Sequence, residues 1–417
     1  GGSREGTGYG VSQRDVFELY DLWQGSTSPG ERIADLTPHT RASMLAMVHQ
    51  IVPTLDRIAP TGDQSRDSTA SFFDYHRSYL QDLIALYPTD PVAPHAQALL
   101  ANSSLPEMSS EFNYVDDFLY ANKNVTATAL DGLGTAYYAP GIGEVYARSG
   151  WDKHATWVNL IAGPYTQSHA HQDQGSLMIY KDGWLAYDVV VDSHSGLPQE
   201  TTAHSLVRIV DTKGKTIEQQ PNYDLSKPDS KVVALHRGTG YLHVAADLTA
   251  AYGGQAIVQQ VQREIVYLEP STVIVYDRVA TTGGQVVFQL VSPVSPPMAL
   301  GTSHTFTASG HTLDVEDIIT PNSTVPTIFD FKTDSSRDFM GGFRLDETAV
   351  GGNNVRFLHV LTIDGAATGI APVSNGVMLM VGGKTVTMTF NLSDIGGTLN
   401  IAGQQITLGS GVDKLPE

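Results

Sequence analysis

Three ionisable side chains stand at every second position in one short stretch of the chain. His169, His171 and Asp173 alternate with uncharged residues between Ser168 and Ser176. Alternation is typical of a β-strand, which would direct all three side chains to one face. Imidazole and carboxylate groups transfer protons and also bind transition metals. The stretch is therefore the first candidate for a catalytic or metal-binding site.

Two further metal-binding side chains follow this stretch. Apolar runs at 177–180 and 184–188, with an Asp-Gly turn between them, predict a β-hairpin. Asp188 ends the hairpin, and His204 follows 16 residues later. With His171 they supply two imidazoles and one carboxylate, a set that suits Zn²⁺. No compact metal-motif spacing is present, so the alternative is three unrelated polar residues on a sheet.

A glycine-rich segment occupies residues 1–10 and contains a tyrosine. Clustered glycines let a backbone pass close to a ligand, and they place Tyr9 just before a helical pattern. Arg4 and Glu5 precede Tyr9 and are candidates for substrate binding. The alternative is a flexible N-terminal loop without a role in binding.

An arginine and a tryptophan share a turn further along the chain. Arg148 offers a bidentate fork for a sugar carboxylate, and Trp151 offers a stacking face. The alternative is a surface pair of Arg148 with Asp152 beside a half-buried Trp151. Arg66, on a loop in the helical half, is a further candidate for a residue facing a cleft. Arg263 is expected to be structural.

The composition limits the classes of function. The chain has 417 residues with 41% apolar and 17% charged residues, which is typical of a folded protein of two or three domains. A net charge of −19 argues against nucleic-acid binding, although a local basic cleft could still hold an anion. Lys and Arg together number only 25, and a highly sulfated ligand would need more basic residues. The low number therefore favours ligands that carry carboxylates.

The cysteine content and the hydropathy limit the cellular compartments in which the protein is expected. The chain has no Cys, which excludes disulfides and thiolate metal sites. No apolar run is long enough to predict a membrane span, and no signal peptide is visible. These features are compatible with a periplasmic or secreted bacterial protein.

The periodicity of apolar residues changes along the chain. Helical spacing occurs at 11–24, 38–55, 69–87, 94–102 and 112–120, and it predicts an all-α bundle or toroid. From Thr135 onward, short alternating segments bounded by Gly, Asn, Asp or Pro predict antiparallel β-sandwiches. The predicted domains are a helical domain at 1–125, a central sandwich at 126–295 and a C-terminal β domain at 296–417.

Several of these blocks together resemble the heparinase II/III-like polysaccharide lyases. The resemblance is carried by residues 1–9, 148–152, 169–176, 183–188, 202–206 and 263–279. It covers most of residues 1–280. It implies a multidomain α+β protein in which an incomplete (α/α) toroid is followed by antiparallel β-sandwich domains, with the active cleft between them.

The resemblance also implies roles for individual residues. Tyr9 matches the catalytic tyrosine, expected to act as acid and also as a candidate base, and His169 matches the catalytic histidine. His171, Asp188 and His204 match the ligands of a structural Zn²⁺, and Asp173 then becomes a hydrogen-bonding neighbour. The family's carboxylate-neutralising pair lies upstream of the tyrosine segment. This leaves two alternatives: a separate N-terminal chain is a candidate partner that would complete the helical domain and carry the pair, or another group neutralises the carboxylate.

The activity implied is β-elimination on a uronic-acid-containing polysaccharide, which leaves a 4,5-unsaturated sugar. The preferred substrate is an unsulfated polyuronate such as alginate. Three alternatives stay open: a glycosaminoglycan lyase of the heparin or hyaluronate type, a zinc-dependent hydrolase, and a non-catalytic carbohydrate-binding protein. The exact polysaccharide, and whether cleavage is endo or exo, do not follow from the sequence.

Overall fold

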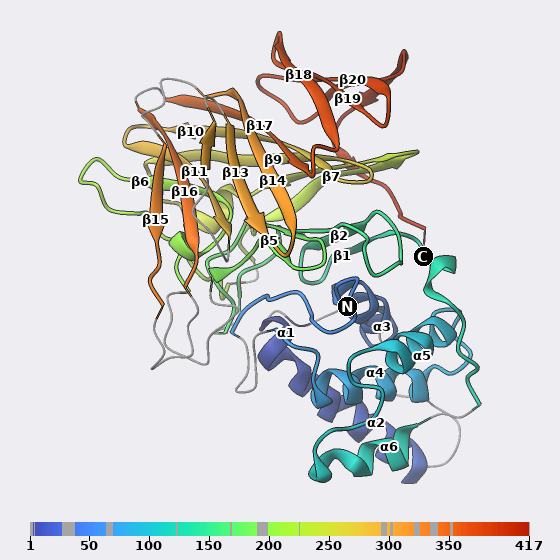
Figure 1. Ribbon diagram of the computed structural model, residues 1–417. Coiled ribbons are helices and arrows are strands. Elements are labelled where there is room, and N and C mark those ends of the chain that lie inside the picture. The colour runs from blue at the N-terminus through green and yellow to red at the C-terminus, as the bar shows by residue number, and fades with distance from the viewer. Residues whose placement is uncertain are drawn as a thin grey trace.

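In the residues that it describes, the computed structural model contains a helical region followed by four sheets of mainly antiparallel strands, with the helices gathered on one side of the molecule (Figure 1). The residues that it describes are 3, 5–26, 38–63, 70–121, 124–166, 169–189, 199–224, 226–292, 298–300, 303–320, 326–333, 341–350 and 353–416.

The helical region matches the segments predicted from apolar spacing. Its described α-helices are α1 Gly6–Tyr9, α2 Arg14–Ser26, α3 Pro38–Gln50, α4 Asp74–Leu86, α5 Ala93–Asn102 and α6 Tyr114–Tyr120. In α4, Leu80, Leu83 and Ile84 follow helical spacing and are at most 1% exposed. The observed helices confirm the predicted helical region in the N-terminal part of the chain. A closed toroid stays a prediction.

The helix predicted at 38–55 is shorter in the structure than in the sequence pattern. α3 ends at Gln50 because the chain then turns back, and Ile51 forms an antiparallel bridge with Ile58. Pro53 stands in this turn, where its missing N–H would interrupt a helix. The extended segment that follows leads to residues 61–63, which become part of the candidate site.

A five-stranded sheet lies against the helices. Its order is β1 Ala136–Ala139, β2 Glu144–Arg148, β3 Trp157–Ile161, β4 Leu177–Tyr180 and β5 Trp184–Ala186. Along β2, Val145 and Ala147 enter the core of the sandwich, while Tyr146 and Arg148 point to the helices. Because side chains alternate along a strand, one face of this sheet packs on the sandwich and the other packs on the helices. The hairpin predicted at 177–188 is confirmed by the pairing of β4 with β5.

Two further sheets form the sandwich behind it. The nine-stranded sheet has the order β12 Met298–Leu300, β13 Ser303–Ala308, β14 His311–Ile319, β17 Asn354–Ile363, β10 Thr272–Thr281, β9 Val258–Leu268, β8 Tyr241–Asp247, β7 Lys231–Gly238 and β23 Gly411–Val412. The four-stranded sheet has the order β15 Thr327–Asp330, β16 Phe343–Val350, β11 Gln285–Ser292 and β6 Val207–Val210. Buried apolar residues from both sheets and from the five-stranded sheet make one continuous core.

The predicted domain boundary at residue 296 is wrong. Strands from 298–363 pair directly with strands from 231–281, so both segments belong to the nine-stranded sheet. The separate C-terminal sheet instead has β18 Ala367–Val373, β19 Gly376–Val381, β20 Lys384–Phe390, β21 Gly397–Ile401 and β22 Gln404–Leu408. It packs on the outer face of the nine-stranded sheet, away from the helices (Figure 1).

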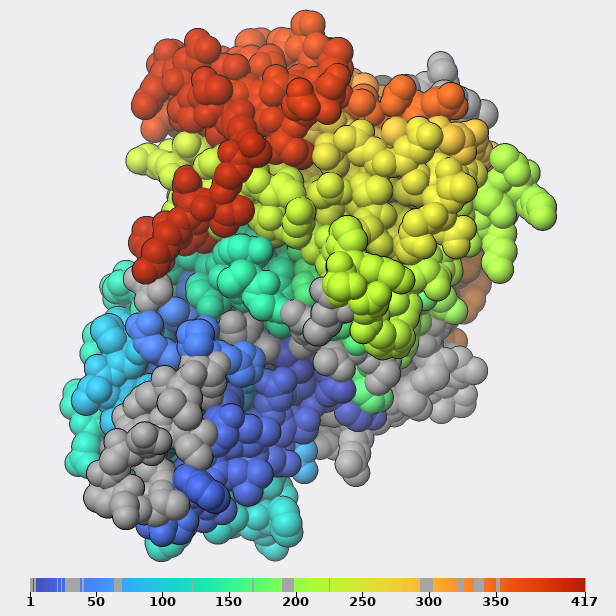
Figure 2. All heavy atoms as spheres, turned by 180° about the vertical axis from the view of Figure 1, so that it is seen from behind, coloured from blue at the N-terminus to red at the C-terminus, as the bar shows by residue number. Residues whose placement is uncertain are grey.

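The last residues of the chain return toward the helical side. Figure 2 shows this C-terminal segment in red, descending from the last sheet across the larger one. β23 pairs in parallel with β7, and Leu415 joins the sandwich core. Among the described helices, none is long and apolar enough to cross a lipid bilayer.

Candidate active site

The histidine-rich stretch is a loop and not a strand, which corrects the sequence prediction. β4 begins only at Leu177, and residues 169–176 form turns and irregular structure. A loop frees consecutive side chains from the two-face rule of a strand. The side chain of His169 is accordingly 37% exposed, whereas that of His171 is 1% exposed. His169 is therefore accessible to a ligand, whereas His171 lies in the protein interior.

The glycine-rich segment brings Tyr9 to this loop. The backbone N–H of Thr7 donates to the Thr61 carbonyl over 2.8 Å, so α1 lies against residues 61–63. Gly6 has φ of 85°, and a Cβ at this position would lie 1.8 Å from the Thr61 oxygen. Only glycine permits that approach. Gly6 thus lets this segment approach another part of the protein backbone, whereas a close approach of these glycines to a ligand stays a prediction.

Tyr9 and His169 stack on each other. Their ring centroids are 4.0 Å apart and their planes differ by 5°. Tyr9 is 46% exposed, so both rings are accessible to a large ligand. The structure thus brings together the two residues predicted to be catalytic, although they are far apart in the sequence. Two groups able to transfer protons stand side by side at the junction of the helices and the sheets.

Asp63 links the exposed histidine to the buried one, and the sequence reasoning missed it. His169 Nδ1 is 3.0 Å from Asp63 Oδ2, and His171 Nε2 is 2.9 Å from Asp63 Oδ1. The Gln199 amide also donates to Oδ1 over 2.6 Å. Burial would raise the pKa of Asp63, but the hydrogen bonds from His171, His169 and Gln199 outweigh it and lower the pKa. In the sequence, Asp63 is distinguished only by its place in a Pro-Thr-Gly-Asp segment that is typical of a loop.

The three predicted metal ligands converge beneath this pair. Asp188 Oδ2 lies 3.2 Å from His171 Nδ1 and 3.2 Å from His204 Nδ1. Each of the three residues is at most 2% exposed. His204 Nδ1 is buried without a hydrogen-bond partner, although it points toward the carboxylate. An unpaired nitrogen beside a second imidazole and a carboxylate fits a transition-metal site.

The charges of this buried cluster are strongly coupled. Burial alone would lower the pKa of His171, but hydrogen bonds to Asp188 and Asp63 raise it to about 10. Burial would likewise raise the pKa of Asp188, and the charge of His204 with the hydrogen bond from His171 holds it well below its ordinary value. The cluster therefore favours an ionised carboxylate. Asp173 is buried nearby, and burial raises its pKa.

Arg263 anchors both segments that carry the histidines. One guanidinium nitrogen donates to the Gly175 carbonyl over 2.7 Å and to the Ser205 carbonyl over 3.0 Å. The other two nitrogens form a bidentate pair with Asp277 at 2.7 and 3.0 Å. Gly175 belongs to the histidine loop, and Ser205 directly follows His204. The structural role predicted for Arg263 is confirmed.

Arg148 and Trp151 were predicted to bind a sugar carboxylate, but in the structure their side chains contact other parts of the protein. Arg148 is 1% exposed and donates to the carbonyls of His49 and Ile51 at the end of α3. Burial lowers its pKa to about 9. Trp151 covers the guanidinium at 3.9 Å and donates to the Leu133 carbonyl. This burial contradicts a substrate contact for Arg148, which instead joins the helices to β2.

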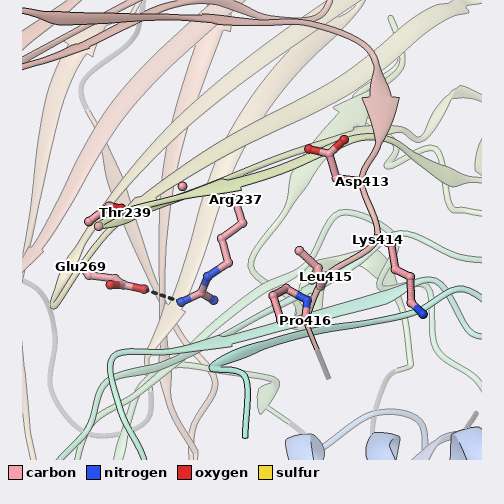
Figure 3. A pocket seen from close by; sticks show the side chains of 9 residues that line it. Arg237, Thr239, Glu269, Asp413, Lys414, Leu415 and Pro416 are labelled. Atoms are coloured by element: carbon pink, nitrogen blue, oxygen red, sulfur yellow. Dashed lines mark hydrogen bonds and ion pairs between the residues drawn. The ribbon is translucent and has the colours of Figure 1, made fainter.

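Of the other predicted substrate-binding residues, Glu5 lies within the part of the chain that the structure describes. Glu5 stands directly before α1, and its main-chain carbonyl contacts the segment around Gly62. Arg4 and Arg66 lie outside the described residues. A hollow of about 690 Å³ lies between the turn that joins β7 to β8 and the C-terminal segment, and Glu5 does not line it. Figure 3 shows Arg237 there, directed toward Glu269, with Lys414 on the C-terminal segment.

Comparisons with known proteins bear on the fold. No protein-family model and no curated protein matches the chain. Among solved structures, the heparan sulfate lyase HepC of Pedobacter heparinus matches 96% of this chain with a TM-score of 0.62 and 14% identity. A heparinase III matches 91% with a TM-score of 0.65 and 12% identity. A chondroitin AC lyase variant of Streptomyces coelicolor A3 matches 93% with a TM-score of 0.52 and 10% identity.

The chain has the heparinase-like polysaccharide lyase fold. It spans 57–61% of the length of these three solved chains. Within the heparinase-like fold, the described helices and the sandwich correspond to the predicted order of a helical region followed by β-sandwiches. By their names, these neighbours act on heparan sulfate and chondroitin, so the named substrates are glycosaminoglycans and not alginate.

Proposed function

We propose that this chain carries the catalytic residues of a lyase that cleaves a uronic-acid-containing polysaccharide by β-elimination. The observation that supports this most directly is the stacked, accessible pair of Tyr9 and His169. The pair offers one hydroxyl and one imidazole at the same position. Elimination needs a group that accepts a carbon-bound proton and a group that donates one to the leaving oxygen.

The proposed reaction uses these two side chains in sequence. His169 Nδ1 bonds to Asp63, which fixes the tautomer and leaves Nε2 as the proton acceptor. The base removes the proton from C5 of the uronate, and the electron pair of that bond forms the C4–C5 double bond. The C4–O bond breaks, and the Tyr9 hydroxyl gives its proton to the departing oxygen. The products are one fragment with the unsaturated uronate at its new non-reducing end and a second fragment with a new reducing end.

We propose a glycosaminoglycan as the substrate class to test first, because the solved neighbours are named for such substrates. The low number of basic residues favours chains with little sulfation, such as chondroitin or hyaluronate. Alginate is the second class. A panel of these polymers, read by the ultraviolet absorbance of the unsaturated product, decides between them. Silence on every polymer in the panel would support a binding protein instead.

The variant Tyr9→Phe tests the residue assignment. It removes only the hydroxyl, and we expect activity to fall by about 10²–10⁴-fold. The matched control is Tyr75→Phe, which changes an exposed tyrosine on α4 that contacts Arg14. Circular dichroism and the thermal midpoint check that both variants keep the fold. Full activity of Tyr9→Phe would refute its role as the acid.

We also propose that His171, Asp188 and His204 hold a structural Zn²⁺. Support comes from their convergence and from the unpaired His204 nitrogen. When bound, the ion would fix the loop that presents His169. All three donors are at most 2% exposed, which argues against a hydrolase in which a metal-bound water attacks the substrate. Metal analysis of wild type and His204→Gln tests this, and equal metal content in both would contradict it.

A further inference from the structure

A second group of metal-binding side chains lies inside the sandwich and takes no part in the proposed elimination. It consists of His304 on β13, Asp317 on β14 and Glu347 on β16. His304 Nε2 is 3.9 Å from Asp317 Oδ2 and 3.9 Å from Glu347 Oε1. The three side chains come from strands of two different sheets, so they span the interior of the sandwich.

The strand register explains why these side chains meet. His304 pairs with Val315, and Asp317 two residues later pairs with His359, so all four side chains lie on one face of the nine-stranded sheet. The register shifts between Asp317 and Ile319, and such a bulge re-aims the side chain beside it. Glu347 reaches the same space from the four-stranded sheet.

Four polar atoms of this group are buried without hydrogen-bond partners. His304 is 4% exposed, yet neither of its ring nitrogens has a hydrogen-bond partner. Glu347 Oε1 and Asp317 Oδ1 are also buried without one. Leaving buried donors and acceptors unpaired is costly, and native proteins rarely do so. Two neighbouring carboxylates add mutual repulsion unless a proton or a cation stands between them.

The remaining neighbour holds one of these carboxylates in place. His359 Nε2 is 2.9 Å from Glu347 Oε2, and its ring stacks on Phe288 at a centroid distance of 3.7 Å. A histidine that bonds the outer oxygen of a carboxylate orients the inner oxygen, as is common behind metal ligands. Burial is the main cause that raises the pKa of Asp317, to about 9, and the neighbouring Glu347 raises it further.

We propose that His304, Asp317 and Glu347 bind a divalent transition-metal ion that joins the nine-stranded sheet to the four-stranded sheet. One imidazole and two carboxylates suit Zn²⁺ or Mn²⁺. Donors that share one tetrahedral ion at about 2.0–2.1 Å lie roughly 3.3 Å apart. Closing the separations of 3.9 Å therefore needs side-chain shifts of about half an ångström. Burial makes the site structural and not catalytic.

Metal stoichiometry tests the proposal in a background that removes the other metal site. Protein carrying His204→Gln is stripped with a chelator, incubated with ZnCl₂ alone, desalted and measured by plasma mass spectrometry. We expect one equivalent of zinc in His204→Gln and none when His304→Gln is added. The matched control adds His311→Gln, which changes a partly exposed histidine at the start of β14 that pairs with Asp364, and it should keep one equivalent.

Two results would overturn the second site. One is zinc-free His204→Gln protein that is folded by circular dichroism. The other is an unchanged zinc content after His304→Gln is added. If the added substitution prevents folding, anomalous diffraction at the zinc edge from wild-type crystals decides. A peak between His304 and Glu347 supports the site, and its absence from a zinc-soaked crystal refutes it. The lyase assay is independent of these outcomes, so failure of the proposed function would not affect them.

Discussion

The ion pair of Arg263 with Asp277 connects the stability of the sandwich to the geometry of the candidate site. Both residues are at most 1% exposed, and the pair is bidentate at 2.7 and 3.0 Å. Asp277→Ala would leave the Arg263 charge buried without a counter-ion. The guanidinium also holds the carbonyls of Gly175 and Ser205, so both histidine-bearing segments would lose their anchor.

The magnitude follows from the two bonds that are lost. Each charge-assisted hydrogen bond contributes about 1.5–3 kcal/mol, and an uncompensated buried charge costs about 3–5 kcal/mol. We therefore expect Asp277→Ala to lower the free energy of unfolding by about 3–5 kcal/mol. Urea unfolding followed by tryptophan fluorescence measures this change. The double variant Arg263→Met with Asp277→Leu removes both charges, so part of the lost stability should return. The recovery is partial because the carbonyls of Gly175 and Ser205 still lose their donor.

A surface pair supplies the control for this measurement. Arg237 and Glu269 are 3.1 Å apart with side chains 24% and 28% exposed. Glu269→Ala should cost less than about 1 kcal/mol, because solvent screens that pair. A loss below about 1 kcal/mol for Asp277→Ala, with an unchanged dependence on urea, would refute the reasoning that the buried pair carries structural energy.

Three further predictions follow. Burial raises the pKa of Glu144 from 4.5 to about 8, so the folded state keeps a proton that the unfolded chain releases. Wild-type stability should fall by about 1.4 kcal/mol per pH unit in that window relative to Glu144→Gln, and parallel urea-unfolding profiles would contradict this. Asp63→Asn should lower kcat by about 10–100-fold and shift its pH profile, whereas lower stability with an unchanged profile would make Asp63 structural. Arg148→Ala should destabilise the fold by about 2–5 kcal/mol without changing KM, and a raised KM at normal stability would restore the substrate-binding prediction.

Local patterns in the sequence predicted part of the secondary structure. Apolar spacing located the helices, and the Asp-Gly turn located the hairpin of β4 and β5. The same patterns predicted that a helical region precedes the β-sandwich. Apolar residues recur about every 3.6 residues in a helix and every two residues in a strand, so a short segment is enough to tell the two apart. The pattern failed at 169–176, where alternating polar residues belong to a loop. It also failed at residue 296, since strand pairing between distant segments leaves no local signal.

The convergence of side chains was decided by the tertiary structure. The types of His171, Asp188 and His204 suggested a metal site, but only packing shows that their donor atoms meet. Asp63 joins His169 across 106 residues of sequence, and no periodicity encodes such a contact. Arg148 had the chemistry of a ligand-binding residue, yet docking of α3 on β2 buries it. Sequence fixes which chemical groups are present and how the local backbone runs, whereas the association of helices and sheets determines which groups become neighbours and which face solvent.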